Sequence, residues 1–224
     1  MKKFGITFIA MLITFGLSAQ LACSKYYPLK KGAHFELTFY DKKDKMSSVV
    51  KYDVKEATAN MATMVATIDD DKGEMVTSSE YTIKCEGDGI SIDFKSLMGS
   101  DMLAQYKDVE MDITGTDIDL PNSLSVGQTL PDASMEALIK IKPINLKMTV
   151  VTTDRKVTGM ETITTPADTF DCVVISYTSE LKMGIKKMLT VKQWYAKGIG
   201  LVKSEEYNKG GKLISKSLLT AFSD

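Results

Sequence analysis

Hydrophobic and polar residues alternate along most of the chain after residue 32. Apolar side chains occupy every second position in residues 33–39, and the same period recurs in residues 50–54, 64–68 and 90–94. Alternation of this kind is typical of β-strands that bury one face and expose the other to water. The pattern therefore predicts a β-rich protein.

Short polar segments separate these runs. Residues 41–45, 69–73 and 86–89 are rich in Asp, Gly and Lys, which favours tight hairpin turns. Strands joined by tight turns usually pair with their neighbours in sequence. We therefore expect the first five strands to form an antiparallel meander.

The middle of the chain is less regular. Residues 95–106 form the best candidate for a short helix, and we expect Asp101 to cap its second half. Alternation resumes in residues 135–141 and is clearest in the C-terminal third, where residues 183–184 and 208–211 predict turns. Roughly a dozen strands at this spacing favour a sandwich or a barrel.

A sheet of this size must curl to bury its apolar face. We predict an all-β fold, a curved antiparallel sheet or incomplete barrel of hairpin-connected strands with one short helix against a face. No low-complexity linker divides residues 20–224, which we expect to form a single β-rich domain.

The N-terminus has the three parts of a bacterial export signal. Lys2 and Lys3 precede an apolar run over residues 4–17, and small residues follow at 18–19. The run is shorter than the ~20 apolar residues of a transmembrane helix. We expect cleavage after Ala19, which removes residues 1–19 and leaves a soluble periplasmic or cell-surface protein.

Cys23 leaves a second processing route open. Leu21-Ala22-Cys23 resembles a loose lipobox, in which residues 1–22 are removed and Cys23 carries a lipid. The position three residues before the cysteine is usually apolar, and here it is Gln20. Cleavage after Ala19 is therefore favoured, and membrane contact is expected only if Cys23 is lipidated.

The chain has three cysteines, Cys23, Cys85 and Cys172, and export permits a disulfide. If Cys23 is lipidated, Cys85 and Cys172 are the one possible pair. If it is not, Cys23–Cys85 is weakly favoured, since it would tie the N-terminus to a strand. Alternatively, Cys85 and Cys172 are small buried hydrophobic residues.

Charge and motifs exclude several classes of function. A net charge of -1 provides no basic field for nucleic acid. The single histidine, His34, has no recognisable nucleophile or carboxylate partner in the sequence. No phosphate-binding loop or histidine-rich metal motif is present, so no cofactor or metal is expected. The carboxylates of residues 69–74, and those of Asp117 and Asp119, are better explained by turns than by calcium binding.

Methionine offers the main hint of a binding surface. Several of the 14 methionines lie on predicted apolar faces. Methionine can line an adaptable apolar cavity, although filling of an irregular core is the favoured interpretation. The methionines on these faces are Met64, Met75, Met135, Met148 and Met183. Trp194 and Tyr195, on opposite faces of one strand, either flank a cavity or pack the sheet, and with Met183 they are the candidate ligand-facing residues.

Several segments resemble the TapB-like family, a domain-of-unknown-function group of exported proteins common in Bacteroidota. The motifs that carry the resemblance are residues 26–33, 126–132, 165–172, 194–205 and 211–213. One departure is Asp168, where the family pattern usually has Gly. The resemblance implies an exported, mostly antiparallel β protein, and it supplies no catalytic residue.

Three functions are compatible with these features. The favoured one is a non-catalytic envelope protein that binds an apolar small molecule or a protein partner in a concave β surface. The second is an assembly or scaffold factor that acts by strand addition at an open sheet edge. The third is a hydrolase with an unrecognised site, for which His34 is the one histidine to test.

Overall fold

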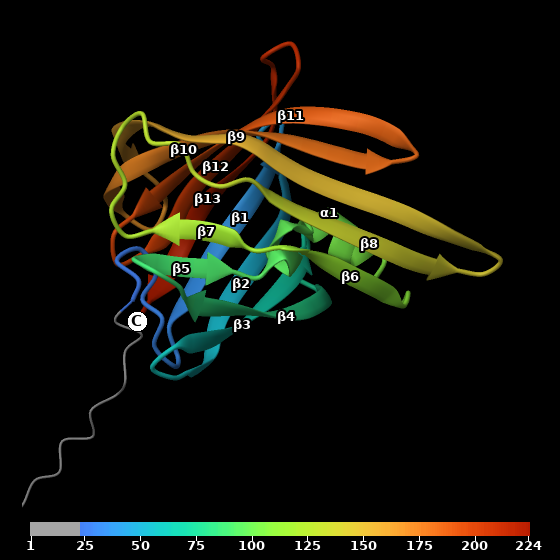
Figure 1. The fold of residues 1–224 in the computed structure, drawn as a ribbon, viewed down its shortest axis with the longest axis horizontal. Helices are drawn as coiled ribbons and strands as arrows, with labels where there is room; N and C mark the ends of the chain where they lie inside the picture. The colour runs from blue at the N-terminus through green and yellow to red at the C-terminus, as the bar shows by residue number, and fades with distance from the viewer. Residues whose placement is uncertain (1–22) are drawn as a thin grey trace, which may run out of the picture.

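The computed structural model describes residues 23–224, and all of its strands belong to one antiparallel sheet of 13 strands (Figure 1). The predicted signal peptide, residues 1–19 or 1–22, lies outside the described residues. None of the helices in the described part of the chain is long and apolar enough to cross a bilayer.

The strands differ widely in length, and two short helical segments interrupt them. The N-terminal elements are β1 (His34–Asp41), β2 (Met46–Ala57), β3 (Met61–Asp70), β4 (Met75–Cys85), β5 (Gly89–Ile92), the 3-10 helix η1 (Phe94–Leu97) and α1 (Ser100–Gln105). The remaining strands are β6 (Met111–Thr116), β7 (Ile118–Pro121), β8 (Ala133–Ile141), β9 (Ile144–Thr164), β10 (Thr169–Met183), β11 (Ile185–Ala196), β12 (Gly200–Asn208) and β13 (Leu213–Ser223).

The order of the strands follows the sequence almost throughout. From edge to edge it is β6-β8-β9-β10-β11-β12-β13-β1-β2-β3-β4-β5-β7. The predicted meander of the first five strands is confirmed, and β8 to β13 form a second one. Pairing of β13 with β1 joins the two meanders, so the last strand of the chain lies beside the first.

The two edge strands of the sheet are consecutive in sequence. β6 lies at one edge and β7 at the other, and only Asp117 separates them. The chain therefore crosses from one edge of the sheet to the other within a single residue. This crossing requires the sheet to curl round on itself (Figure 1). The predicted all-β fold, a strongly curved and nearly closed barrel, is confirmed.

The predicted helix forms as two short pieces that cover one side of the sheet. Met98 and Tyr106 anchor them in a cluster with β8 and β9 side chains. Asp101 does not cap α1, which corrects the expectation. Gly99 is the N-cap, and its carbonyl accepts the backbone N–H groups of Met102 and Leu103, so Asp101 already lies inside the first turn.

β9 is the longest strand of the sheet. It spans 21 residues and contains a bulge. Ser176 pairs with Lys156 and Thr178 with Thr153, which sets Asp154 and Arg155 opposite the single residue Tyr177. Asp154 adopts the left-handed conformation, with φ of 56°. A bulge of this kind reverses which residues face inward, so both Thr152 and Arg155 are buried.

The main hydrophobic core lies inside the curved sheet. It contains alternate residues of β1 to β4, such as Leu37 and Met64, together with Val173 and Ile175 of β10. The residues that alternate with them in β10, Cys172 and Val174, pack in a separate cluster on the opposite face of the sheet, with Trp194. The predicted alternation therefore produces two buried faces in this part of the barrel.

Candidate ligand cavity

The interior of the curved sheet is not completely filled. A cavity of about 280 Å³ lies on the concave face, bounded by β1 to β4, by β9 to β13 and by the segment of η1 and α1. Aliphatic and aromatic side chains make up much of its wall. They include Phe35, Leu37, Val50, Met64, Ile83 and Leu201. The volume is near the lower end of small-molecule sites, which are typically about 300–1,000 Å³.

Five tyrosines line this cavity. They are Tyr27, Tyr52, Tyr81, Tyr177 and Tyr195. Burial raises the pKa of Tyr52 and of Tyr195 to about 12 and that of the other three well above its ordinary value. The phenols therefore stay protonated near neutral pH, so they present O–H groups within a largely apolar wall.

Tyr27 reaches the cavity from the segment that precedes β1. Its ring packs edge-on against Phe35 and Tyr195, with centroids 6.1 and 6.4 Å away. Gly200 makes this position possible, because a Cβ at Gly200 would lie 2.5 Å from Cε1 of Tyr27. The N-terminal segment thus forms part of the cavity wall.

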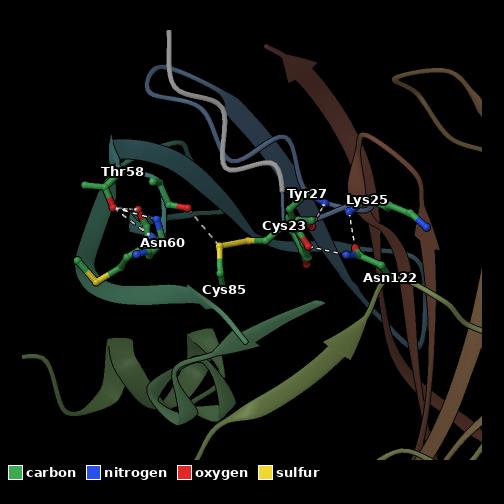
Figure 2. Close-up of a disulfide and its surroundings, with 10 residues drawn as sticks. Cys23, Lys25, Tyr27, Thr58, Asn60, Cys85 and Asn122 are labelled. Atoms are coloured by element: carbon green, nitrogen blue, oxygen red, sulfur yellow. Dashed lines mark hydrogen bonds between the residues drawn. A yellow bond between two sulfur atoms is a disulfide. The ribbon is translucent and has the colours of Figure 1, made fainter. Parts of the chain in front are cut away.

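A disulfide and an asparagine hold this segment from two sides (Figure 2). Cys23 is bonded to Cys85 at the end of β4. Asn122 donates from Nδ2 to the carbonyl of Cys23 at 2.6 Å and accepts the backbone N–H of Lys25 at 2.6 Å. The pairing expected for an unlipidated Cys23 is therefore the one in the structure. Cys172 is free and buried, and burial raises its pKa to about 11.

Arg155 is the one charged side chain buried deep in the cavity wall. It is the only arginine in the sequence, and 4% of its surface is exposed. Nη1 donates to the carbonyl of Pro131 at 2.6 Å and Nη2 to that of Asp119 at 2.9 Å. Arg155 thus joins β9 to the edge strand β7 and to the loop before β8, and it contributes to barrel closure.

Other polar groups lie along the same concave face. The hydroxyl of Tyr195 donates to Oε1 of Gln193 at 2.8 Å, and Ser215 donates to Glu206 at 2.7 Å. Oγ of Ser217 is buried without a hydrogen-bond partner. The wall therefore combines apolar area with a small set of polar groups, as small-molecule sites usually do.

The structure places the three candidate ligand-facing residues in different environments. Tyr195 lines the cavity. Trp194 does not, because it is next in the strand and points to the opposite face, where Nε1 donates to Glu161 at 2.8 Å and Lys203 lies 4.5 Å above the ring. Met183 does not line it either, since it packs beside the helical segment and accepts the hydroxyl of Tyr106. Trp194 therefore follows the alternative that it packs the sheet, and Met183 lies outside the cavity wall.

Three of the five candidate methionines, Met64, Met135 and Met148, are buried in a core, as the interpretation of core filling predicts. Met64 is the one member of the predicted set that lines the cavity. Met135 and Met148 are buried in the cluster beneath the helices, whereas Met75 is 70% exposed.

The remaining candidate groups lie away from the cavity. Nδ1 of His34 contacts a carboxylate of Asp53 at 2.8 Å, a cross-strand neighbour that the sequence alone did not identify. The segment over residues 69–74 forms the predicted turn, in which Asp70 accepts the backbone N–H groups of Lys72 and Glu74. These hydrogen bonds lower the pKa of Asp70. Within residues 23–224, no group of three or more His, Cys, Asp or Glu side chains is arranged to hold a metal ion.

Sequence reasoning did not identify Arg155 or the tyrosines other than Tyr195 as parts of one site. A signal was present, because Tyr52, Tyr81 and Tyr177 occupy the apolar positions of alternating strands. Arg155 interrupts such a pattern, and its inward direction depends on the bulge at Asp154.

Comparisons with known families and solved structures identify proteins to which this chain is similar. The family model described as DUF3108-like matches residues 30–219. The chain belongs to the DUF3108-like family. A search of curated proteins found no match.

Two solved structures share the fold of this DUF3108-like protein. A candidate exported protein of Bacteroides fragilis, described as having a YmcC-like fold, is 21% identical with a TM-score of 0.79, over 90% of this chain and 100% of that one. A candidate lipoprotein of Parabacteroides distasonis is 23% identical with a TM-score of 0.76, over 90% and 99% of the two chains. At these identities the likeness establishes the YmcC-like fold.

Proposed function

We propose that this protein is an exported, non-catalytic binding protein that holds an apolar small molecule inside its curved sheet. The observation that carries the proposal is the cavity of about 280 Å³ with its aromatic and aliphatic wall. Burying an apolar ligand there would remove its surface from water, which favours binding by about 25 cal/mol per Å² before the costs of association.

Export is supported by the signal-like N-terminus and by the descriptions of the two structural neighbours as a candidate exported protein and a candidate lipoprotein. The disulfide favours the soluble product. Its Cys23 sulfur is the atom that a lipoprotein would use to carry its lipid, and a sulfur bonded to Cys85 has no valence left for a thioether. Cleavage after Ala19 is therefore our proposal. We also propose that the protein belongs to the TapB-like group, because of the motifs in its C-terminal third.

The alternatives have less support from the geometry. Strand addition needs an accessible sheet edge. The two edge strands span 6 and 4 residues and are linked through Asp117, so both edges are short and lie close to the closure of the barrel. A hydrolytic site at His34 would lie outside the cavity, beside Asp53.

A blocking substitution tests the proposal. Ala66 on β3 lines the cavity, and Thr67 follows it on the same strand with its side chain on the other face. We expect Ala66→Phe to fill the cavity and to weaken binding of the neutral fluorescent probe N-phenylnaphthylamine by about tenfold or more, since a tenfold loss corresponds to about 1.4 kcal/mol. Probe titration of the purified mature protein measures this.

Thr67→Phe is the matched control, because it adds the same ring to the same strand outside the cavity. It should bind the probe as the unmodified protein does. Equal binding by both variants, or no binding by the unmodified protein, would contradict the proposal.

A further inference from the structure

The cavity wall contains a buried positive charge that forms no ion pair within the described part of the chain. Arg155 is 4% exposed, and none of the ion pairs among the described residues includes it. Burial lowers the pKa of Arg155 and the charges of Asp119 and Asp132 act to raise it, yet neither carboxylate forms one of these ion pairs with it. Buried charges are usually paired, so this arrangement is incomplete as it stands.

The fold directs this charge toward the cavity. The bulge at Asp154 turns Arg155 inward opposite Tyr177. The carbonyls of Pro131 and Asp119 accept one hydrogen bond from each terminal nitrogen. These bonds fix the plane of the guanidinium without neutralising it, and the group carries more N–H donors than two carbonyls use.

Two phenols extend the donor surface next to Arg155. Tyr177 lies across the bulge from it, and both Tyr177 and Tyr195 line the same cavity. Burial raises the pKa of each phenol, so both remain O–H donors near neutral pH. The hydroxyl of Tyr195 donates to Gln193, whereas no hydrogen bond among the described residues engages that of Tyr177.

The acidic group of the cavity defines where an anion would not bind. Glu206 also lines the cavity, its negative charge helps to raise the pKa of the Tyr177 phenol, and it accepts a hydrogen bond from Ser215. An anionic head group would be repelled there and attracted at Arg155. The apolar wall formed by Leu37, Met64 and Ile83 remains for the rest of such a molecule.

We propose that the cavity binds a single-chain amphiphile whose anionic carboxylate or phosphate head pairs with the Arg155 guanidinium and whose alkyl chain lies against the apolar wall. This inference rests on the proposed function and specifies its ligand class. A guanidinium binds either head in a two-pronged geometry. The cavity of about 280 Å³ is suited to one chain.

Three probes with the same alkyl chain test the head-group preference. They are palmitate, cetyl phosphate and cetyl alcohol, each titrated into the purified mature protein below its critical micelle concentration. We expect the anionic probes to bind at least about tenfold more tightly than the alcohol, since charge-assisted hydrogen bonds are roughly twice as strong as neutral ones. The better of the two anions then identifies a fatty-acid or a phosphate-headed ligand.

Variants assign the preference to Arg155. Arg155→Gln should remove the preference for anionic probes while leaving alcohol binding within about twofold. Arg155→Lys should retain part of the preference, because a lysine ammonium still provides a point charge. Lys156→Gln is the matched control, since Lys156 is exposed beside Arg155 and its loss should change nothing. If Arg155 variants fail to fold, Tyr177→Phe tests the same donor surface and should reduce the preference at least twofold.

The outcomes separate the two proposals. If no probe binds, the proposed function fails. If the alcohol binds as tightly as the anions, the cavity is an apolar site and the anionic ligand class is overturned. If the preference for anions survives both Arg155→Gln and Tyr177→Phe, the pairing of the head group with Arg155 is overturned. Loss of preference with retained alcohol binding supports both proposals.

Discussion

At the scale of single residues, a few positions have conformations that the cavity depends on. Asp154 and Gly200 both adopt positive φ angles, of 56° and 97°. The first creates the bulge that turns Arg155 inward, and the second leaves room for the ring of Tyr27. Replacement at either position would act on the cavity wall through the backbone.

Gly200→Ala should destabilise the protein. The new Cβ would lie 2.5 Å from the Tyr27 ring, in a backbone conformation that L-residues rarely adopt. We expect a loss of about 1–3 kcal/mol in the free energy of unfolding, measured by urea denaturation. Gly159→Ala is the control, because a Cβ at Gly159 meets nothing within 4 Å and its φ is not positive. Equal effects of the two substitutions would contradict the role given to Gly200.

At the scale of elements, the N-terminal segment is attached to the barrel rather than built into it. It contributes no strand before β1, and its contacts are the Cys23–Cys85 disulfide, the Asn122 hydrogen bonds and the packing of Tyr27. A cross-link over 62 residues of sequence limits the freedom of the unfolded chain and places Tyr27 at the cavity.

Removal of the disulfide should therefore lower both stability and binding. We expect the Cys23→Ser/Cys85→Ser variant to lose about 2–4 kcal/mol in the free energy of unfolding and to bind N-phenylnaphthylamine more weakly.

The mature protein should begin at Gln20 in mass spectrometry and gain two reactive thiols on reduction.

The variant is its own control, because reductant should not destabilise it further. A lipid on Cys23 would contradict both the disulfide and the proposed processing after Ala19. A free Cys85 thiol in the unreduced protein would contradict the disulfide.

At the scale of the whole molecule, barrel closure creates a buried interior that contains several phenols. Tyr52 and Tyr195 come from opposite parts of the sheet, β2 and β11, and burial raises the pKa of each to about 12. Neither strand alone would desolvate them. The shifts are thus a property of the closed sheet.

These shifts predict a loss of stability in alkali. Between pH 10 and about 12 the phenols of Tyr52 and Tyr195 ionise in the unfolded chain, whereas the folded protein keeps both protonated. The unfolded state then binds fewer protons, so the free energy of unfolding falls as pH rises. For Tyr195 the loss amounts to roughly 2–3 kcal/mol by pH 12.

Urea denaturation at a series of pH values measures this effect, and phenolate absorbance reports the ionisation. Tyr195→Phe should make the fall in stability above pH 10 shallower. A folded protein whose tyrosines all ionise near pH 10 would show that the phenols are not buried.

The sequence by itself determined most strands, most turns and the pairing of the first five strands, because alternation and turn-forming residues are local properties. The period-two runs around Leu37, Val50 and Met64 predicted the meander and its inward face, and the alternation of Trp194 with Tyr195 predicted their opposite sides. The family resemblance added the expectation of an exported β protein without an assigned activity.

Only the tertiary structure decided which residues of the alternating strands border the cavity. Trp194 is buried and Met183 is half-buried against other parts of the protein, whereas Tyr27, Tyr52 and Tyr177 converge from segments far apart in sequence. Arg155 faces inward because of one bulge, and it closes the barrel through carbonyls of Asp119 and Pro131. Such placement depends on sheet curvature and on contacts between residues far apart in sequence, which local periodicity does not encode.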